Sequence, residues 1–553
     1  MSTVKLRIDG RDAEVDQGKT ILEAAQSLGI CIPTLCHHKA LIPRGACRMC
    51  IVEDKGRLKA SCTMPAENGM DIITNSPRIQ HIRTTTIQMI FTSRNHYCMY
   101  CEVSGNCELQ DLGYKLGMDH FSFETYEKRY PVDVSHPYIM IEHNRCILCG
   151  RCIRACTDLA GHFVLTESNR GVKTLIVADL QQPLGQSSCV SCGACVQVCP
   201  TGALIEKRAA YQRSRDKNEQ IKTVCDMCPV GCGIEVYANP GTNAVVKIHG
   251  DWDAKPANGL LCRQGRYLAL YEEHRKVASP RMRTGNAMKD ISTGDLGGVI
   301  RDKIKGAAAY VDGSLYNEEI EIIKTLFKEK VYSIRPVNAP LAPTARMEDL
   351  NKAELIVMFR IDLDAQYGVL GSLIKRRVAR NEARFILVDA PSKTFSIFPG
   401  ERLTSSEFIP RVQELTKGTD CMFVYQDLDE KEKETLGKLE GARFIWLPPE
   451  TNTLGLARLG IEHAAPAGNA VFFFGRDIPE VNFADGTFVA CFSPYENPLT
   501  MRADLVVPLR DGFERGGTFY NIDGDRMEKE PVLKAGPGAI DLKTVLSSIM
   551  AKG

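Results

Sequence analysis

Long hydrophobic runs and net charge are what this sequence lacks. Its apolar segments, such as Ala470 to Phe474, are far shorter than the roughly 20 residues of a membrane-spanning helix, and no apolar signal segment stands at the N-terminus. The 69 basic and 68 acidic residues leave a net charge of +1, which gives no global field to attract nucleic acid or anionic lipid. These absences predict a cytoplasmic, soluble protein, either free or peripheral to a membrane complex.

Cysteines are scarce in the second half of the chain and crowded in the first. Twenty of the 22 cysteines lie at or before Cys262 in a chain of 553 residues, a length that predicts three to five domains. A disulfide framework is typical of a short secreted chain, whereas clustered thiols without a signal segment are typical of metal ligands in a reducing compartment. The cysteine distribution therefore divides the chain near residue 270.

The same four-cysteine pattern occurs twice between residues 146 and 199. Both copies read Cys-x2-Cys-x2-Cys-x3-Cys, as in two-cluster ferredoxins, where the fourth cysteine of each run binds the cluster of the other run. The alternative is zinc, whose structural sites usually have two Cys-x2-Cys pairs separated by a longer loop. Two complete patterns favour [4Fe-4S] clusters. The predicted ligand sets are Cys146, Cys149, Cys152 and Cys199 for one cluster and Cys189, Cys192, Cys195 and Cys156 for the other.

Residues 1–79 are predicted to form a small domain around a two-iron cluster. Val4 to Ile8 and Ala13 to Val15 indicate a β-hairpin, and Thr20 with Glu23 predicts a capping box at the start of a helix. Four cysteines then spread over a long loop, with a wider first gap than in plant-type ferredoxins. The predicted [2Fe-2S] ligands are Cys36, Cys47, Cys50 and Cys62, and the additional Cys31 is expected to be a buried structural thiol.

A third cysteine group, in residues 80–120, is one thiol short of a four-iron set. A helix capped by Ser76 leads into it. The apolar face of this helix is predicted to contain Ile79, Ile82 and Met89. Because imidazole can replace a thiolate as a cluster ligand, His96 is the nearest candidate for the fourth position, and a different fourth ligand stays open. The predicted [4Fe-4S] ligands are His96, Cys98, Cys101 and Cys107.

Two further segments complete the chain. Residues 218–274 contain a last cysteine group, for which zinc is again the alternative to a [4Fe-4S] cluster; its members are Cys225, Cys228, Cys232 and Cys262. From 275 to 553, short apolar runs alternate with helical patterns, which predicts a parallel sheet with crossover helices. No G-x-G-x-x-G follows these runs, so the sequence indicates no dinucleotide site. The expected strands are Leu355 to Phe359, Arg384 to Val388, Arg443 to Trp446, Ala470 to Phe474 and Phe488 to Phe492.

Several segments resemble one family of redox subunits. The ten-residue gap of the first group resembles the complex I G subunit of NADH-quinone oxidoreductase. The run from Asn95 to Gln110 is similar to the diaphorase iron-sulfur subunit of NAD-linked hydrogenases, although the usual family histidine would fall on Arg94. The context from Asn258 to Cys262 resembles the cluster subdomain of molybdopterin oxidoreductases, and the order of modules resembles the N-terminal part of the NAD-dependent formate dehydrogenase alpha chain. Both ferredoxin patterns are complete, whereas complex I G subunits generally keep one.

The resemblance implies a truncated molybdopterin-oxidoreductase-like domain after the last cysteine group. Only about 290 residues follow Cys262, and pterin-using relatives usually have a lysine where this chain has Gln264. Cys421 and Cys491 lie in or beside apolar segments and are expected to be core thiols. No molybdopterin and no independent active site are therefore expected.

The combined expectation is a multidomain α+β and α/β protein that carries one [2Fe-2S] and four [4Fe-4S] clusters. The expected domains are a two-iron ferredoxin-like β-grasp domain (1–79), a His/Cys helical module (80–120), a two-cluster ferredoxin domain (136–209), a cluster subdomain (218–274) and the truncated α/β domain (275–553). Five arginines stand in or beside cluster patterns, where they either raise cluster potentials by their charge or form solvated surface. They are Arg44, Arg48, Arg145, Arg151 and Arg154.

The function that this resemblance implies is electron transfer within a cytoplasmic NAD(P)H-linked oxidoreductase complex. The expected partners are a flavin-containing, NADH-oxidising subunit and a further redox subunit. The alternatives are a self-contained molybdopterin-dependent chain of the formate dehydrogenase type and a zinc-rich interaction scaffold. An iron-only hydrogenase is disfavoured, because no C-terminal cysteine set remains to hold its active site.

Overall fold

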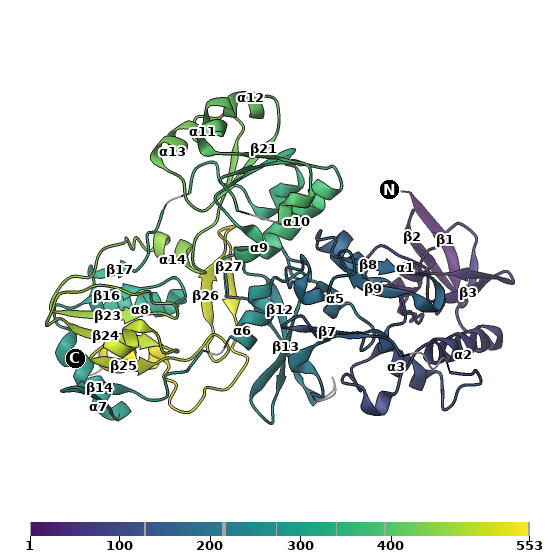
Figure 1. Ribbon diagram of the computed structural model, residues 1–553, viewed down its shortest axis with the longest axis horizontal. Coiled ribbons are helices and arrows are strands. Elements are labelled where there is room, and N and C mark those ends of the chain that lie inside the picture. The colour runs from purple at the N-terminus through teal and green to yellow at the C-terminus, as the bar shows by residue number, and fades with distance from the viewer. Residues whose placement is uncertain are drawn as a thin grey trace. The chain divides into compact units, whose positions relative to one another are not determined.

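The computed structural model describes residues 2–125, 129–212, 217–272, 274–338, 340–391 and 394–550. The chain divides into two compact units, residues 1–218 and residues 219–553, so the last cysteine group belongs to the same unit as the C-terminal sheets. Figure 1 labels many of the helices and strands of both units. Among the described helices, none is long and apolar enough to cross a membrane.

A five-stranded mixed sheet opens the N-terminal unit, with strand order β2-β1-β5-β3-β4. Its first two strands form the expected hairpin, which turns at Asp9 and Gly10, both at positive φ. Thr20 and Glu23 form the predicted capping box. The elements are β1 (Thr3–Ile8), β2 (Arg11–Asp16), α1 (Ile21–Ser27), β3 (Ile51–Asp54), β4 (Arg57–Ala60) and β5 (Asp71–Ile73). Apolar side chains of α1 and of the sheet, among them Ile8, Leu22 and Ile72, form one buried core.

Helix α2 (Pro77–Thr92) starts at the predicted cap, where the Ser76 hydroxyl accepts a hydrogen bond from the Ile79 N–H. The predicted apolar face was wrong in part, because Met89 is 48% exposed. The buried face instead follows a four-residue spacing, as side chains at i and i+4 share one face of a helix; it contains Ile79, Arg83, Ile87 and Phe91, with Thr92 beside them. Arg83 donates to the backbone carbonyls of Met49 and Ile51, on either side of Cys50. The buried arginine thus holds the backbone segment that contains Cys50 in place.

Short elements hold the paired cysteine patterns. A three-stranded sheet of order β10-β7-β6 and a two-stranded ribbon of β8 and β9 frame two one-turn helices, each of which starts inside one pattern. The elements are α3 (Glu108–Lys115), β6 (Val132–Asp133), β7 (Ile139–Glu142), α4 (Arg151–Arg154), β8 (Leu165–Ser168), β9 (Leu175–Ala178), α5 (Ala194–Gln197) and β10 (Leu204–Glu206). Buried thiols share this small core with apolar side chains such as Ile139, Leu165 and Ile176.

All five strands expected after residue 275 are present, but they belong to two sheets rather than one. Three of them lie in a parallel sheet of order β20-β19-β18-β21-β22, and the last two lie in a seven-stranded sheet of order β15-β14-β25-β24-β23-β16-β17. A run of apolar residues identifies a buried strand without identifying its neighbours, which is why the single sheet was wrong. The smaller sheet is built from β18 (Leu355–Phe359), β19 (Arg384–Val388), β20 (Glu401–Leu403), β21 (Cys421–Tyr425) and β22 (Arg443–Trp446), with helices α9 (Leu363–Gln366), α10 (Gly368–Ala379), α11 (Ser405–Phe408), α12 (Val412–Thr416) and α13 (Glu430–Leu436).

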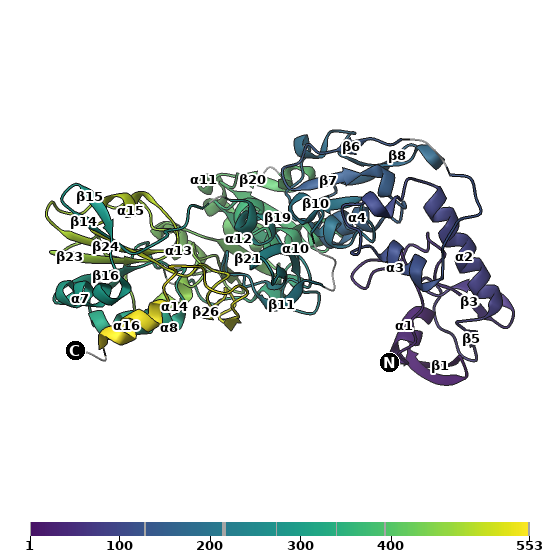
Figure 2. The ribbon, with the colours of Figure 1, turned by 90° about the horizontal axis from the view of Figure 1, so that it is seen from below.

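The seven-stranded sheet buries both of its faces. Figure 2 shows α7, α8 and α16 on one face, where alternate strand residues such as Phe472 and Phe492 form a core with them. The opposite residues, among them Phe473 and Cys491, pack in a second core with Leu499. The elements are β14 (Arg281–Thr284), β15 (Ala287–Asp290), α7 (Thr293–Ile304), β16 (Ala308–Val311), α8 (Asn317–Phe327), β17 (Val331–Ser333), α14 (Thr453–Arg458), β23 (Ala470–Phe474), β24 (Phe488–Ser493), α15 (Pro498–Arg502), β25 (Leu505–Pro508) and α16 (Leu542–Met550).

The last cysteine group lies beside an antiparallel sheet of three strands, which precedes both large sheets in the chain. Its elements are β11 (Glu219–Val224), β12 (Gly233–Asn239), β13 (Ala244–Gly250) and the short helix α6 (Ala269–Tyr271). A C-terminal ribbon of β26 (Gly517–Tyr520) and β27 (Arg526–Lys529) packs on β11, and Thr223 exchanges two hydrogen bonds with Glu530. Segments 307 residues apart thereby frame this cysteine group.

Strands β16 and β23 are neighbours, and the chain leaves them in opposite directions, toward β17 on one side and toward β24 on the other. At such a reversal the carboxyl ends of parallel strands open a crevice. Asp312 follows β16 at this point and accepts hydrogen bonds from Ser314 and from the Asp477 N–H. A Cβ on Gly475 would lie 2.1 Å from the Asp312 carboxyl carbon, so only glycine fits there.

A second buried carboxyl group stands beside Asp312. The Glu450 side chain is 11% exposed, accepts a hydrogen bond from the Gly313 N–H at 2.7 Å, and lies 2.9 Å from the Arg335 guanidinium. Burial, with the charge of Asp312, raises the pKa of Glu450 to about 8 in spite of Arg335. Burial likewise raises the pKa of Asp312. This pair of carboxyl groups therefore holds a proton at a pH where the unfolded chain has released it.

Replacing Glu450 by glutamine is expected to flatten the dependence of stability on pH. Between the unfolded pKa near 4.5 and the folded pKa near 8 the folded state binds more protons, so its stability falls as pH rises. For Glu450 this loss amounts to about 3 kcal/mol between pH 5 and pH 8. Urea unfolding at both pH values, with Glu440→Gln on an exposed loop as control, measures it. An unchanged pH slope in Glu450→Gln contradicts the assignment.

Candidate metal centres

Four thiols converge at one edge of the N-terminal mixed sheet. Cys36 and Cys47 exchange hydrogen bonds from backbone N–H to sulfur, each 3.4 Å long, and Cys50 Sγ lies 3.2 Å from Cys62 Sγ. Hydrogen bonds from Cys47 and Cys62 lower the pKa of Cys36, so the two pairs form one group. A hydrogen bond from Cys62 lowers the pKa of Cys50 to about 6. These are the four cysteines that the sequence predicts to act together, and thiolate is the form in which they would bind metal.

His96 and three thiols line one cavity in the N-terminal unit. Cys98, Cys101 and Cys107 face the same space as the His96 ring. The Nε2 atom of His96 is buried and has no hydrogen-bond partner within the described residues. Burial, with the charges of Arg145 and Arg94, lowers the pKa of His96 to about 3. A buried neutral imidazole with an unpartnered nitrogen has the chemistry of a metal ligand.

Arg94, where the resemblance would place a histidine, does not line this cavity. Its guanidinium donates to the backbone carbonyls of His143 at 2.7 Å and Thr174 at 2.5 Å, and it lies over the Tyr130 ring. A buried arginine that binds two backbone carbonyls holds their segments together and has a structural role. The chain therefore offers His96, not residue 94, to the three thiols.

The paired cysteine patterns are crossed in space. The thiol charges that act on Cys149 come from Cys199 and Cys146, although Cys199 belongs to the second pattern. The first three cysteines and Cys199 line one cavity. Correspondingly, Cys189 is influenced by Cys192 and by Cys156 from the first pattern. The structure therefore brings together the same two sets of four that the spacing predicts.

Equal backbone geometry supports the two patterns. Leu148 and Ser191 occupy the same place in each pattern, both have positive φ, and each donates its N–H to a cysteine sulfur at 3.4 Å. The next glycines, Gly150 and Gly193, are left-handed caps of α4 and α5. Glycine tolerates this conformation at low cost, and each turn aims successive sulfurs at one point. The two cysteine patterns therefore share their backbone conformation as well as their cysteine spacing.

Burial makes these thiol groups unstable as anions on their own. It raises the pKa of Cys146 to about 11 and the pKa values of Cys149, Cys156 and Cys189 to about 12, and neighbouring thiolates add to the rise. A cation must be bound before four such thiolates can coexist, and metal binding supplies it. No three His, Cys, Asp or Glu side chains in the described parts of the chain close tightly around a single ion. The donor chemistry, four soft sulfurs around a space, suits a cluster of several irons.

The last cysteine group lies between the three-stranded sheet and helix α10. Each of Cys225, Cys228 and Cys232 is influenced by the charge of Cys262, which comes from the far end of the segment. Two glycines, which sequence reasoning missed, leave room for the sulfurs. A Cβ on Gly265 would lie 2.9 Å from Cys225 Sγ, and one on Gly368 would lie 2.7 Å from the Cys262 Cβ. The spacing to the cysteine could have indicated Gly265, but Gly368 lies in a distant part of the sequence.

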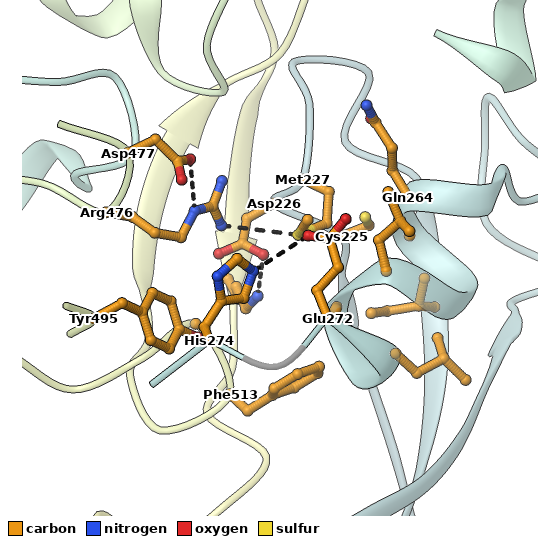
Figure 3. A pocket seen from close by; sticks show the side chains of 17 residues that line it. Cys225, Asp226, Met227, Gln264, Glu272, His274, Arg476, Asp477, Tyr495 and Phe513 are labelled. Carbon is orange, nitrogen blue, oxygen red and sulfur yellow. Dashed lines mark hydrogen bonds and ion pairs between the residues drawn. The ribbon is translucent and has the colours of Figure 1, made fainter. Parts of the chain in front are cut away.

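A cavity of about 340 Å³ borders this group (Figure 3). One wall contains Cys225 and Gln264, and the other contains side chains at the carboxyl ends of β23 and β24, with Phe513. Figure 3 shows the Arg476 guanidinium between Asp477, which accepts from it at 3.0 Å, and Met227. Buried charges in the wall are paired, since Asp226 binds Lys529 at 2.5 Å and the Tyr316 hydroxyl at 2.8 Å.

The neutral Gln264 stands where the resemblance would place a lysine. Its Nε2 donates to the Ala365 carbonyl at 3.2 Å, and its buried Oε1 has no hydrogen-bond partner within the described residues. The side chain therefore ties the last cysteine group to α9 and adds no charge to the cavity.

The five arginines near the cysteines differ in exposure. Arg151 is buried, Arg145 and Arg154 are half-buried, and Arg44 and Arg48 are exposed. Arg44 forms an ion pair with Glu167 at 2.8 Å and occupies the space where a Cβ on residue 150 would stand. Arg145 donates to Asn95 at 2.8 Å and lines the cavity of His96. Of the two roles expected for these arginines, that of a solvated surface residue therefore fits Arg48 and does not fit Arg151.

The three remaining cysteines lie outside these groups. The expectation for Cys31 was wrong, because its side chain is exposed in the loop that follows α1. Its neighbours Ile32 and Leu35 are buried, and Cys31 falls on the outer side of that extended loop. Cys421 in β21 and Cys491 in β24 are buried core thiols, as expected.

Four family descriptions match consecutive parts of the chain. The matches are "2Fe-2S iron-sulfur cluster binding domain" at residues 1–77, "NADH-ubiquinone oxidoreductase-G iron-sulfur binding region" at 83–121, "NADH-quinone oxidoreductase subunit 3, ferredoxin-like domain" at 136–205 and "Molybdopterin oxidoreductase Fe4S4 domain" at 219–274. The chain is therefore a multidomain mixed α/β protein with a two-iron domain and several Fe4S4-binding domains.

Individual relatives agree with these matches. The chain is 32% identical over 327 residues to the NADH-quinone oxidoreductase G subunit 2 of Rhizobium meliloti, which covers 57% of this chain and 37% of that protein. It is 24% identical over an alignment of 640 residues to the NADH-quinone oxidoreductase subunit 3 of Thermus thermophilus, covering 96% of this chain and 80% of that protein. Several other curated relatives are matched over about half of their length.

A shorter relative is matched almost completely. The gamma subunit of the NAD-reducing hydrogenase HoxS of Cupriavidus necator is 32% identical over 213 residues, which is 38% of this chain and 89% of that protein. The cysteine groups of the N-terminal unit and these matches lead to one conclusion. The chain belongs to the family of iron-sulfur subunits that includes the G subunit of NADH-quinone oxidoreductase and the gamma subunit of NAD-reducing hydrogenase.

Proposed function

We propose that the chain is the electron-relay subunit of a cytoplasmic NAD(P)H-linked oxidoreductase complex. The observation that carries this proposal is the gathering of nineteen thiols and one imidazole into five groups of four side chains. When bound, each iron-sulfur cluster supplies reversible one-electron chemistry. The protein's part is to hold, bury and charge-balance the clusters.

The proposed ligands are the five groups described above. One [2Fe-2S] cluster takes Cys36, Cys47, Cys50 and Cys62. Four [4Fe-4S] clusters take His96, Cys98, Cys101 and Cys107; Cys146, Cys149, Cys152 and Cys199; Cys189, Cys192, Cys195 and Cys156; and Cys225, Cys228, Cys232 and Cys262. The orphaned Nε2 of His96 supports the one set that lacks a fourth thiol.

The finer domain assignment is part of the proposal. The sheet order β2-β1-β5-β3-β4 with α1 packed on it supports a β-grasp domain for residues 1–79. We assign residues 80–120 to the His/Cys module, 136–209 to the two-cluster ferredoxin domain and 218–274 to the last cluster subdomain. We assign residues 275–553 to a molybdopterin-oxidoreductase-like α/β domain without an active site, which the neutral Gln264 and the paired charges of the cavity support.

A relay needs partners on both sides. The names of the relatives, which are subunits of NADH-linked and hydrogenase enzymes, support a flavin-containing NADH-oxidising donor subunit and a further redox subunit. We place the chain in the cytoplasm, free or peripheral to a membrane complex.

A second candidate is a self-contained molybdopterin-dependent chain of the formate dehydrogenase type. The match of residues 219–274 to a molybdopterin oxidoreductase domain and the cavity of about 340 Å³ beside Cys225 favour it. Metal content separates the two candidates.

Anaerobically purified protein is expected to contain about 18 irons per chain, from one two-iron and four four-iron clusters. Zinc, molybdenum and tungsten should each remain far below one per chain. Inductively coupled plasma analysis of the protein as isolated with its natural partners measures all four metals. Stoichiometric molybdenum or tungsten supports the second candidate, and a colourless zinc protein contradicts both.

The chain without added subunits is expected to leave NADH unoxidised in the presence of a viologen dye, because the proposed relay has no hydride-accepting group of its own. Adding the partner flavin subunit should start dye reduction, and the rate is followed by absorbance. NADH oxidation by the chain alone, after removal of any contaminating flavin, argues against a pure relay.

His96→Ala is expected to remove one cluster, which lowers the iron content from about 18 to about 14 per chain. His96→Cys should keep the iron and lower the potential of that cluster, since histidine ligation raises it. Iron analysis and electron paramagnetic resonance (EPR) redox titration measure both effects. His120→Ala, at an exposed histidine of the same unit, is the control. Full iron content in His96→Ala means that another group is the fourth ligand.

A further inference from the structure

One arginine reaches three cysteine groups at once. Arg151 is the first residue of α4 and is 2% exposed. Its Nη2 donates to the His37 carbonyl at 2.6 Å and to Glu108 Oε2 at 2.9 Å. Its Nη1 donates to Glu108 Oε1 at 2.8 Å and to the Val198 carbonyl at 3.3 Å. The guanidinium therefore binds three segments that are far apart in the sequence.

Each of these partners is the chain neighbour of a cysteine. His37 follows Cys36 of the first group, Glu108 follows Cys107 of the His96 group, and Val198 precedes Cys199. Arg151 itself precedes Cys152, which shares a group with Cys199. One planar side chain thus connects three groups, and in each group its partner is the residue next to a cysteine.

We propose that Arg151 is a positioning residue that fixes the two-iron site, the His96 site and the Cys146 site relative to one another. This inference rests on the proposed ligand sets. The mutual placement of the three sites then depends on a single side chain.

The chemistry of arginine suits this task. The guanidinium presents five N–H donors in a rigid plane, so it can bind a carboxylate with two parallel bonds and still reach carbonyls on either side. Lysine has three donors on a flexible stem and cannot reproduce that plane. Burial opposes the charge of Arg151, but the hydrogen bonds and charge of Glu108 outweigh it and raise the pKa of Arg151.

A second arginine on the same helix strengthens the same connection. Arg154 lies three residues on, so it projects from the same face as Arg151. Its Nη2 donates to the Cys36 carbonyl at 2.6 Å and to the Cys149 carbonyl at 3.3 Å. Arg154 thus ties two of the three groups, whereas Arg151 also reaches the segment of Cys107.

The test separates position from charge with four variants of the full chain. Arg151→Lys keeps the positive charge and loses the planar set of N–H donors. Arg151→Met loses both. Glu108→Gln removes the negative partner, and the double variant Arg151→Met/Glu108→Gln removes both charges. Arg170→Met, at an exposed arginine of the same unit, is the matched control. The readouts are iron content, EPR redox titration and the spin–spin interaction between reduced neighbouring clusters.

Arg151→Met is expected to lower the ratio of reduced to oxidised Cys146-group cluster about tenfold at fixed potential, which is about 59 mV for a one-electron couple. Glu108→Gln should raise that ratio, and the double variant should return it to within about threefold of the original chain. Spin–spin interaction should nevertheless differ from the original chain in the double variant and in Arg151→Lys, because position is lost even where charge is balanced.

Original spin–spin interaction in Arg151→Lys and in the double variant, at full iron content, overturns the proposal. If Arg151→Met does not assemble, Arg151→Lys and Glu108→Gln decide the question, because each leaves part of the hydrogen-bond network in place. Absence of cluster signals in the original chain would instead mean that the proposed function itself has failed.

Discussion

Anionic sulfur inside protein is the constraint on which the N-terminal unit depends. Thiolates repel one another, and burial raises their pKa values, so each group of four is tolerable only around a cationic centre. The fold meets this constraint with particular backbone conformations in addition to its apolar cores. Positive-φ residues such as Leu148 and Ser191 aim N–H groups at sulfur, and buried arginines hold the loops through their carbonyls. Stability and cofactor retention should therefore be inseparable in this unit.

Outside its cysteine group, the C-terminal unit depends on apolar packing. Two large sheets bury continuous apolar strands, and the carboxyl edge of one sheet opens toward the last cysteine group. At this edge the charges are satisfied internally, by Asp226 with Lys529 and by Arg476 with Asp477. An edge whose ionic groups are already paired offers little binding energy to a charged ligand. The fold alone consequently does not argue for catalysis there.

Sequence reasoning succeeded where one local pattern decides the outcome. The hairpin, both helix caps and all five expected strands are present, because alternation, capping side chains and apolar runs act over a few residues. It failed where contacts between distant segments determine the strand pairing or the exposure of a side chain. The division of the strands between two sheets depends on pairing that the runs do not encode, and the exposure of Cys31 and Met89 depends on what packs beside them. Spacing predicted which thiols meet, but the roles of Arg94 and Arg151 depend on partners 43 to 114 residues away.

The crossed pairing of the two cysteine patterns has a consequence for biosynthesis. On the proposed ligand sets, neither pattern can complete a cluster from its own four thiols, since Cys199 closes the first set and Cys156 closes the second. A nascent chain that ends at residue 188 has the whole first pattern and none of the second, so it can close neither site. The second set is complete only when Cys195 is present, and the first only when Cys199 is present, so neither cluster can be loaded early. A chain truncated between the patterns would therefore be empty in this segment rather than half filled.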